Sequence, residues 1–165
     1  MPREYQGRAT KTFQKLYGFK KLYAWQKADD LAAAVHKMTA DWGPGYYRLS
    51  DQMRSAAVSV KSNIAEGYCR ASLGDYIRFC EIARGSLGEL GSLIQDCERW
   101  GLAGGTTLAD LLDQYSGTTA VLEALIAALK KKQRSGDWDK SFGTKETGEG
   151  YMTDDASLVD DTVGP

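Results

Sequence analysis

A line of hydrogen-bonding side chains with spacings of four, three and four residues runs along one predicted helix: Ser59, Asn63, Glu66 and Arg70. This spacing places them on one side of the helix, beside an apolar stripe. Glu89, in the next predicted helix, lies where it could meet Ser59, Asn63 or Arg70. Clustered carboxylates could bind a metal ion for phosphoryl chemistry. Because Asn63 and Arg70 flank Glu66, we favour a structural network without catalytic residue or metal, made of Ser59, Asn63, Glu66, Ser86 and Glu89.

A second set of candidate residues is basic and could contact phosphate groups. Arg54 and Lys61 lie seven residues apart on the far side of the same helix, and the sequence 130–134 places four cations at the end of the last helix. Cations are stabilised at a helix C-terminus, but four in five residues exceed what capping needs. We expect nucleic-acid contacts from Arg54, Lys61, Arg70, Lys130, Lys131, Lys132 and Arg134. No stacking platform is visible, so we expect binding led by the backbone and weak in sequence preference.

Charge is distributed unevenly along the chain of 165 residues, although the formal net charge is only -1. Residues 1–134 carry 19 Lys and Arg against 14 Asp and Glu, whereas residues 135–165 carry two lysines against eight acids. We therefore distinguish a flexible basic arm (1–21), a helical domain (22–134) and an acidic, Gly-rich tail (135–165) that we expect to be disordered. The tail could fold back on the basic cluster and compete with nucleic acid; an ordinary solubilising tail is the alternative.

Apolar residues at intervals of three and four predict four helices. The first runs over about 22–41 and ends at the breakers 43–45, the second covers about 46–71, and Ser72 caps a third that reaches residue 100. Thr107 is expected to cap the fourth helix, which extends to about residue 134. This pattern predicts an all-α fold.

Two features of the helices indicate close packing and self-association. Gly85, Gly88 and Gly91 are unfavourable inside a helix, so we expect another element to pack tightly against them. In the fourth helix, the rows 108-115-122-129 and 111-118-125 are both apolar or Thr. We expect one row to face the bundle and the other to face a second subunit.

The cysteines and the termini indicate the compartment. Cys69, Cys80 and Cys97 are odd in number and have no C-x-x-C spacing, which argues against a disulfide framework or a zinc site. No stretch resembles a signal peptide or approaches the ~20 apolar residues that cross a membrane. We therefore expect a cytoplasmic protein without a cofactor and without membrane contact.

Several segments resemble a known family, and they are Phe19-x-x-Leu22-x-x-Trp25-Gln26-Lys27-Ala28, Gln52-Met53-Arg54-x-Ala56-Ala57-Val58-Ser59, Ser62-Asn63-Ile64-Ala65-Glu66-Gly67 and Phe79-x-x-Ile82-Ala83-Arg84-Gly85-Ser86-Leu87-x-Glu89-Leu90. Over about residues 19–130 the chain resembles the four-helix bundle proteins encoded by intervening sequences of bacterial 23S rRNA genes. That group is related to the accessory variability determinant proteins of diversity-generating retroelements.

The resemblance implies an antiparallel up-down four-helix bundle that assembles as a homopentamer and has no known enzymatic activity. For retroelement members it implies a basic assembly that binds RNA and a reverse transcriptase. Two departures stand out: the family often has proline where this chain has Lys61, and the acidic tail is not part of the family pattern.

Three functions remain open from the sequence. The first is a non-catalytic accessory protein that binds RNA and a reverse transcriptase. The second is a protein-binding scaffold that ignores nucleic acid, with its cations serving subunit contacts or solubility. The third is a nuclease using Glu66 and Glu89, which we disfavour because an ion-pair network explains those acids.

Overall fold

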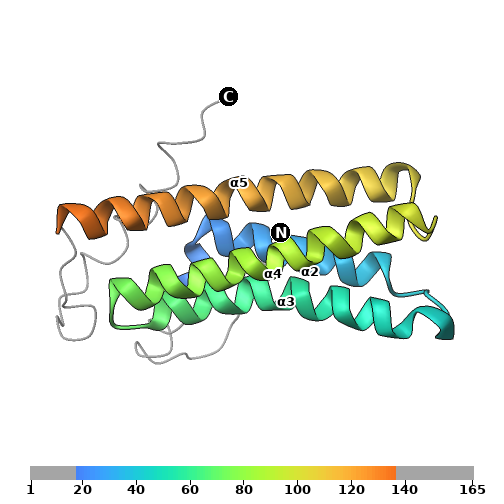
Figure 1. The fold of residues 1–165 in the computed structure, drawn as a ribbon, viewed down its shortest axis with the longest axis horizontal. Coiled ribbons are helices and arrows are strands. Elements are labelled where there is room, and N and C mark those ends of the chain that lie inside the picture. Colours follow the sequence, from blue (N-terminus) through green and yellow to red (C-terminus); the bar gives the residue numbers. More distant parts are fainter. Residues whose placement is uncertain (1–17, 137–165) are drawn as a thin grey trace, which may run out of the picture.

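The computed structural model describes residues 18–136, which form four long α-helices with no strand among the described residues (Figure 1). The elements in chain order are η1 (Gly18–Lys21), α2 (Tyr23–Met38), η2 (Pro44–Tyr46), α3 (Tyr47–Cys69), α4 (Leu73–Arg99) and α5 (Gly105–Ser135). The predicted all-α class and four-helix bundle are therefore confirmed. Most of the predicted basic arm and acidic tail lies outside the described residues.

The helices run alternately up and down, and each packs against two others (Figure 1). α3 lies between α2 and α4, and α5 closes the bundle by packing on α4 and α2. As a result, the α3–α4 connection and the C-terminus of α5 lie at one end. The α2–α3 and α4–α5 connections lie at the opposite end (Figure 1).

The helix ends differ in detail from those predicted. α2 ends at Met38 rather than near residue 41, with Thr39 as its C-cap. The predicted cap of α4 is confirmed, because Ser72 Oγ accepts from the Asp75 backbone N–H at 3.0 Å. Thr107 is not a cap: α5 starts two residues earlier, and Gly104 occupies its N-cap. Gly105 has a φ of 60°, in the left-handed region that favours glycine.

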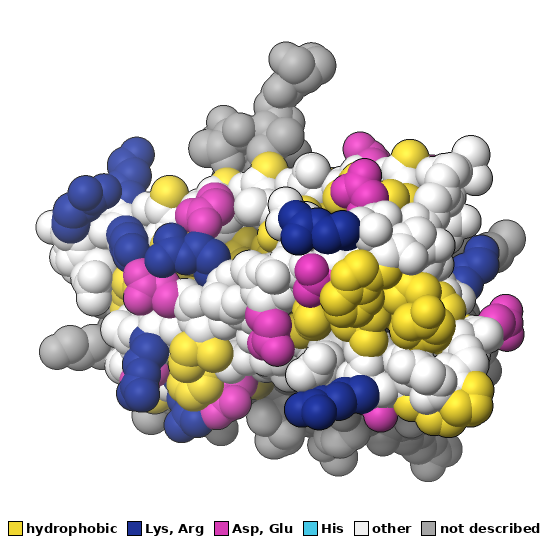
Figure 2. Space-filling model, turned by 45° about the vertical axis from the view of Figure 1, so that its right-hand side comes forward, with side chains coloured by type: hydrophobic (Ala, Val, Ile, Leu, Met, Phe, Trp, Pro, Cys, Tyr) yellow, Lys and Arg dark blue, Asp and Glu magenta, His cyan; other side chains and the backbone are white. Residues whose placement is uncertain are grey.

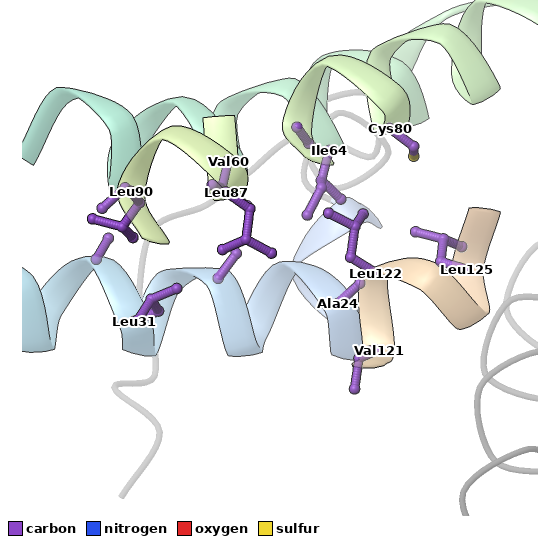
Figure 3. Close-up of a cluster of buried hydrophobic side chains, with 14 of the residues drawn as sticks. Ala24, Leu31, Val60, Ile64, Cys80, Leu87, Leu90, Val121, Leu122 and Leu125 are labelled. Atoms are coloured by element: carbon purple, nitrogen blue, oxygen red, sulfur yellow. The ribbon is translucent and has the colours of Figure 1, made fainter. Parts of the chain in front are cut away.

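The core is formed by apolar side chains that all four helices direct inward (Figure 3). Leu31, Val60 and Leu90 are fully buried and come from three different helices. Leu122 and Leu125 of α5 complete the cluster. Burying such side chains stabilises the fold by roughly 1.5–3 kcal/mol each, so this layer holds the bundle together.

The glycines of α4 do not all pack closely, which corrects one prediction. A Cβ built on Gly91 would approach the Tyr115 ring carbon Cζ to 2.8 Å, whereas a Cβ on Gly85 or Gly88 would meet nothing within 4 Å. A second close contact to α4 comes from Gly67 of α3, where a Cβ would lie 2.9 Å from Phe79 Cβ. Gly67 therefore sets the close approach of α3 to α4.

The two apolar rows of α5 also differ from expectation. Leu111, Thr118 and Leu125 are buried, and so are the other row's Leu108, Leu122 and Leu129. Because α5 sits in the corner between α2 and α4, both rows face the same bundle, and neither row is left for a second subunit. Within residues 18–136, no helix is long and apolar enough to cross a membrane.

Candidate nucleic-acid interface

A short hydrogen-bonded chain joins α3 to α4 at the polar line predicted from the sequence. Asn63 Nδ2 donates to Ser59 Oγ at 3.0 Å and to the Ser59 carbonyl at 2.8 Å. Ser59 Oγ lies 2.8 Å from Ser86 Oγ, and Ser86 can in turn donate to the Ile82 carbonyl at 3.3 Å. Each hydroxyl accepts one bond and donates the next, so Ser59, Asn63 and Ser86 form one satisfied structural contact.

The two acids of the predicted network are separated from these three residues. Glu66 pairs with Arg70 one turn later on α3, and the Arg70 guanidinium lies 4.8 Å from the centre of the Phe79 ring. Glu89 lines an open groove beside Ser59 but makes no hydrogen bond or ion pair with the described residues. No group of three or more His, Cys, Asp or Glu that could hold a metal occurs within residues 18–136.

Arg54, predicted to contact phosphate, instead joins two helices. Its Nε donates to Thr39 Oγ1 at 2.7 Å, and its Nη2 donates to the Thr39 carbonyl at 2.8 Å. The Thr39 hydroxyl in turn donates a hydrogen bond to the Val35 carbonyl at 2.9 Å. Arg54 thus satisfies groups at the C-terminal end of α2, where orphan carbonyls and the helix dipole favour a cation. Its guanidinium is committed to packing α3 on α2.

Lys61 also has a partner within the bundle. Its Nζ lies 2.6 Å from Asp29 Oδ1 of α2. Only 28% of the lysine side chain is exposed, because its stem lies along the α2–α3 contact. Lys61 therefore serves the same helix pair as Arg54, and both lie away from the end where the other basic candidates gather.

The remaining candidates lie together at the end where α3 and α5 terminate. Lys130 Nζ pairs with Glu81 Oε1 of α4 at 2.7 Å. The hydrogen bond from Lys130, and then its charge, lower the pKa of the Glu81 carboxyl below its ordinary value of 4.5. Exposed pairs of this kind contribute little to stability, but this pair shows that Lys130 near the end of α5 lies beside Glu81 of α4.

Beyond Lys130 the cations outnumber the acids. Lys131 and Arg134 are exposed and have no ion-pair partner among the described residues. The structure adds Arg78 of α4, which is also exposed, and Lys20 and Lys21 of η1, which packs beside the end of α3. Figure 2 shows Lys and Arg side chains concentrated at this end and the larger hydrophobic areas toward the other.

We name this surface the basic end and define it by residues 18–22, 66–81 and 129–136. It contains eight cations against the three acids Glu66, Asp75 and Glu81. Sequence reasoning missed the contribution of Arg78, because only the bundle topology brings the start of α4 beside the end of α5. Grouped cations with few acids raise the local concentration of anions, so the basic end can hold phosphate groups.

The cysteines offer no activated nucleophile. Cys80 and Cys97 are buried, as expected of small apolar side chains, and all three cysteines are free thiols. Burial and the neighbouring Asp96 raise the pKa of Cys97 to about 11. Burial also raises the pKa of Cys69 above its ordinary value. Thiol chemistry requires the thiolate, which these environments disfavour.

The family comparison agrees with the fold. A family model described as "23S rRNA-intervening sequence protein" matches residues 20–124, more than half of the chain. The match begins in η1 and ends inside α5, so Lys130–Arg134 and the acidic tail lie beyond it. No curated protein matches the chain.

Proposed function

The chain belongs to the 23S rRNA-intervening sequence protein family, and from this premise we propose that it is a non-catalytic protein that binds the phosphate backbone of RNA. The single observation that carries the proposal is the basic end. There Lys131 and Arg134 are exposed and without ion pairs among the described residues. Such a surface suits phosphate, because cations in solution near RNA are released when Lys or Arg replaces them.

The chemistry of the basic end favours the RNA backbone over the bases. Lysine acts as a point charge toward phosphate, and arginine can donate two parallel hydrogen bonds. Phe79, the aromatic ring paired with Arg70, is half-buried and covered by that guanidinium, so it offers no open face for stacking. We therefore expect weak sequence preference and a strong dependence on salt.

The test is a direct comparison of two triple variants with the full chain. The first replaces Lys131, Lys132 and Arg134 by Gln at the basic end. The matched control replaces three exposed cations near the opposite end by Gln, namely Lys37, Arg48 and Arg99. Both lose three charges, so a general effect of net charge would weaken them equally.

Fluorescence anisotropy with a labelled single-stranded RNA at several salt concentrations gives the readout. We expect the basic-end variant to lose at least tenfold in affinity, with a salt slope that is smaller by roughly 2 for three lost phosphate contacts. The control should bind within about twofold of the parent chain. Equal losses in both variants, or no binding by the parent, would contradict the proposal.

A narrower part of the proposal concerns the protein partner. The resemblance to accessory variability determinant proteins leads us to propose a reverse transcriptase of a diversity-generating retroelement. Co-purification with a reverse transcriptase encoded beside this gene would support that partner. A gene that lies inside an rRNA gene, without a reverse transcriptase nearby, would favour the intervening-sequence setting instead.

Self-association is proposed as well, with a homopentamer as the form that the resemblance implies. Ile82 is a large apolar residue that is 42% exposed. It lies one turn before Ser86, whose hydroxyl meets Ser59 of α3, and the nearby Gly85 leaves the backbone of α4 open. These features favour the α3–α4 face over α5 as the subunit contact.

A charge on this face tests the subunit contact. We expect Ile82→Glu to lower the solution mass measured by light scattering, because a carboxylate would be buried at the contact. Leu112→Glu is the matched control, since Leu112 is exposed to a similar 40% on α5. An oligomer that ignores RNA would support the protein-binding scaffold as the alternative function.

A further inference from the structure

The same chain contains a segment whose net charge is opposite to that of the basic end. Residues 137–165 contain eight acids and two lysines, a charge of -6, whereas the basic end contains eight cations and three acids, a charge of +5. We propose that the basic end is the docking surface of the chain's own acidic C-terminal segment, residues 137–165, which competes there with RNA. The competition rests on the proposed function, but the docking does not.

Some cations of the basic end already have an ion-pair partner, and the others mark where an acidic segment could bind. Glu66 already neutralises Arg70, and Glu81 neutralises Lys130. Arg78, Lys131 and Arg134 remain exposed, without an ion pair among the described residues. The uncompensated cations therefore lie where the last turns of α5 meet the first turns of α4.

The register of these two helices supports this placement. Lys130 pairs with Glu81, and a Cβ built on Gly74 would lie 4.0 Å from Gln133 Nε2. Arg78 lies between residues 74 and 81 of α4, opposite the turn that carries Lys131. Arg78 and Lys131 thus lie at the same end of the α4–α5 pair, where an anion would be attracted by both charges.

The point of attachment makes the segment a local ligand. α5 ends at Ser135, and Gly136 turns away with a φ of 73° in the left-handed region. Eighteen residues lead from Gly136 to Asp154, and a stretch of that length spans up to roughly 60 Å. Two helices side by side are only ~20 Å across, so the aspartates at 154, 155, 160 and 161 can reach every cation of the basic end.

Tethering also makes weak ion pairs effective. A segment attached by a short linker acts at an effective concentration in the millimolar range. If it covered the basic end nine-tenths of the time, the apparent Kd for RNA would rise tenfold. Exposed ion pairs are screened by salt, so the effect should fade as the salt concentration rises.

Docking is tested first, on the full chain and without RNA. A zero-length carbodiimide cross-linker joins carboxylates to amines that touch, and mass spectrometry identifies the pairs. We expect carboxylates of residues 154–161 to be linked to Lys131 and Lys132 at low salt, and not to Lys37 at the opposite end. Absent links, or links spread equally over these lysines, would overturn the docking whether or not RNA binds.

Competition is tested by neutralising acids in the full chain. Asp→Asn at 154, 155, 160 and 161 should raise RNA affinity about tenfold at low salt, with the gain shrinking as salt increases. The matched control carries Asp→Asn at four exposed positions near the opposite end, namely 41, 51, 110 and 113. A general charge effect would give both variants the same gain and would overturn the competition.

The two readouts separate the possible failures. Cross-links to Lys131 together with an unchanged RNA affinity of the neutralised variant would overturn competition. Cross-links together with no RNA binding by either the parent or the neutralised variant would contradict the proposed function and leave the docking supported.

Discussion

At the scale of single residues, basic side chains that look alike in the sequence have different roles. Arg54 donates two hydrogen bonds to Thr39 and is held in the bundle. Lys131 is exposed at the end of α5 and has no partner within residues 18–136. The Arg54 side chain is held in place by its hydrogen bonds, whereas the Lys131 side chain is accessible to a phosphate. Charge alone does not distinguish them.

Arg54→Ala should destabilise the fold without weakening RNA binding. The substitution removes the two hydrogen bonds that the charged guanidinium donates to Thr39. One of them is made to the Thr39 carbonyl at the end of α2, which then loses this donor. We expect the free energy of unfolding to fall by about 1.5–3 kcal/mol, measured by chemical denaturation. Arg48→Ala removes a charge from an exposed position nearby, and it should change stability by less than ~0.5 kcal/mol. Equal effects would refute the helix-joining role.

Glu81→Gln should change the response of stability to acid. The pKa of Glu81 is lowered in the folded protein by Lys130, so the ionised carboxylate stabilises the fold above its ordinary pKa of 4.5. That contribution is lost as the pH falls through the lower folded-state pKa. Denaturation curves over the acid range should therefore show the parent losing its advantage over Glu81→Gln below pH 4.5. Glu98→Gln is the control, since it removes an exposed carboxylate that has no ion pair among the described residues.

At the scale of helices, the α3–α4 contact depends on a missing side chain. Gly67 lies where a Cβ would be 2.9 Å from Phe79 Cβ and 3.1 Å from the Tyr76 carbonyl oxygen. The carbonyl belongs to the backbone of α4 and cannot rotate away. The absence of a side chain at Gly67 therefore allows the close approach of α3 to α4.

Gly67→Ala should destabilise the protein although alanine is the better helix former. We expect a loss of about 1–3 kcal/mol from overpacking, measured as a lower denaturation midpoint. Gly117→Ala in α5 is the matched control: a Cβ there would meet nothing within 4 Å, so the propensity gain of ~1 kcal/mol should appear. A stabilising Gly67→Ala would show that the helices can move apart freely.

Local patterns predicted the helices well because periodicity and turn residues are local signals. The breakers at 43–45, the Ser72 cap and the buried stripe of Met53, Val60 and Ile64 all follow from neighbouring residues. The bond from Arg54 to Thr39 could not be predicted this way, since it depends on the rotation of α3 against α2. The exposure of Gly85 and Gly88 likewise depends on which neighbours α4 acquires in the bundle.

The basic end was predicted only in part for the same reason. The run Lys130–Arg134 is visible in the sequence, but its partner Glu81 and its neighbour Arg78 come from α4. Antiparallel packing brings these segments together. A cation at the start of one helix and a cluster at the end of another become one surface only after the topology is known.

At the scale of the whole molecule, the two ends of the bundle differ in chemistry. Cations gather where α3 and α5 end, while exposed aromatic rings lie at the opposite end at Tyr46, Tyr47 and Trp100. This division gives the bundle one end suited to phosphate. The acidic segment that we propose to dock there begins at that same end, after Gly136.

The central claim, binding of RNA through the basic end, is tested most directly by the solution mass of the full chain. Light scattering would be run with and without a stem–loop RNA at about 50 mM and about 200 mM salt, between which multi-phosphate contacts weaken steeply. We predict an oligomer, of about 90 kDa if it contains five copies of the 18.1 kDa chain, that gains mass with RNA at low salt and loses the gain at high salt. An unchanged mass with RNA at both salt concentrations would contradict the account.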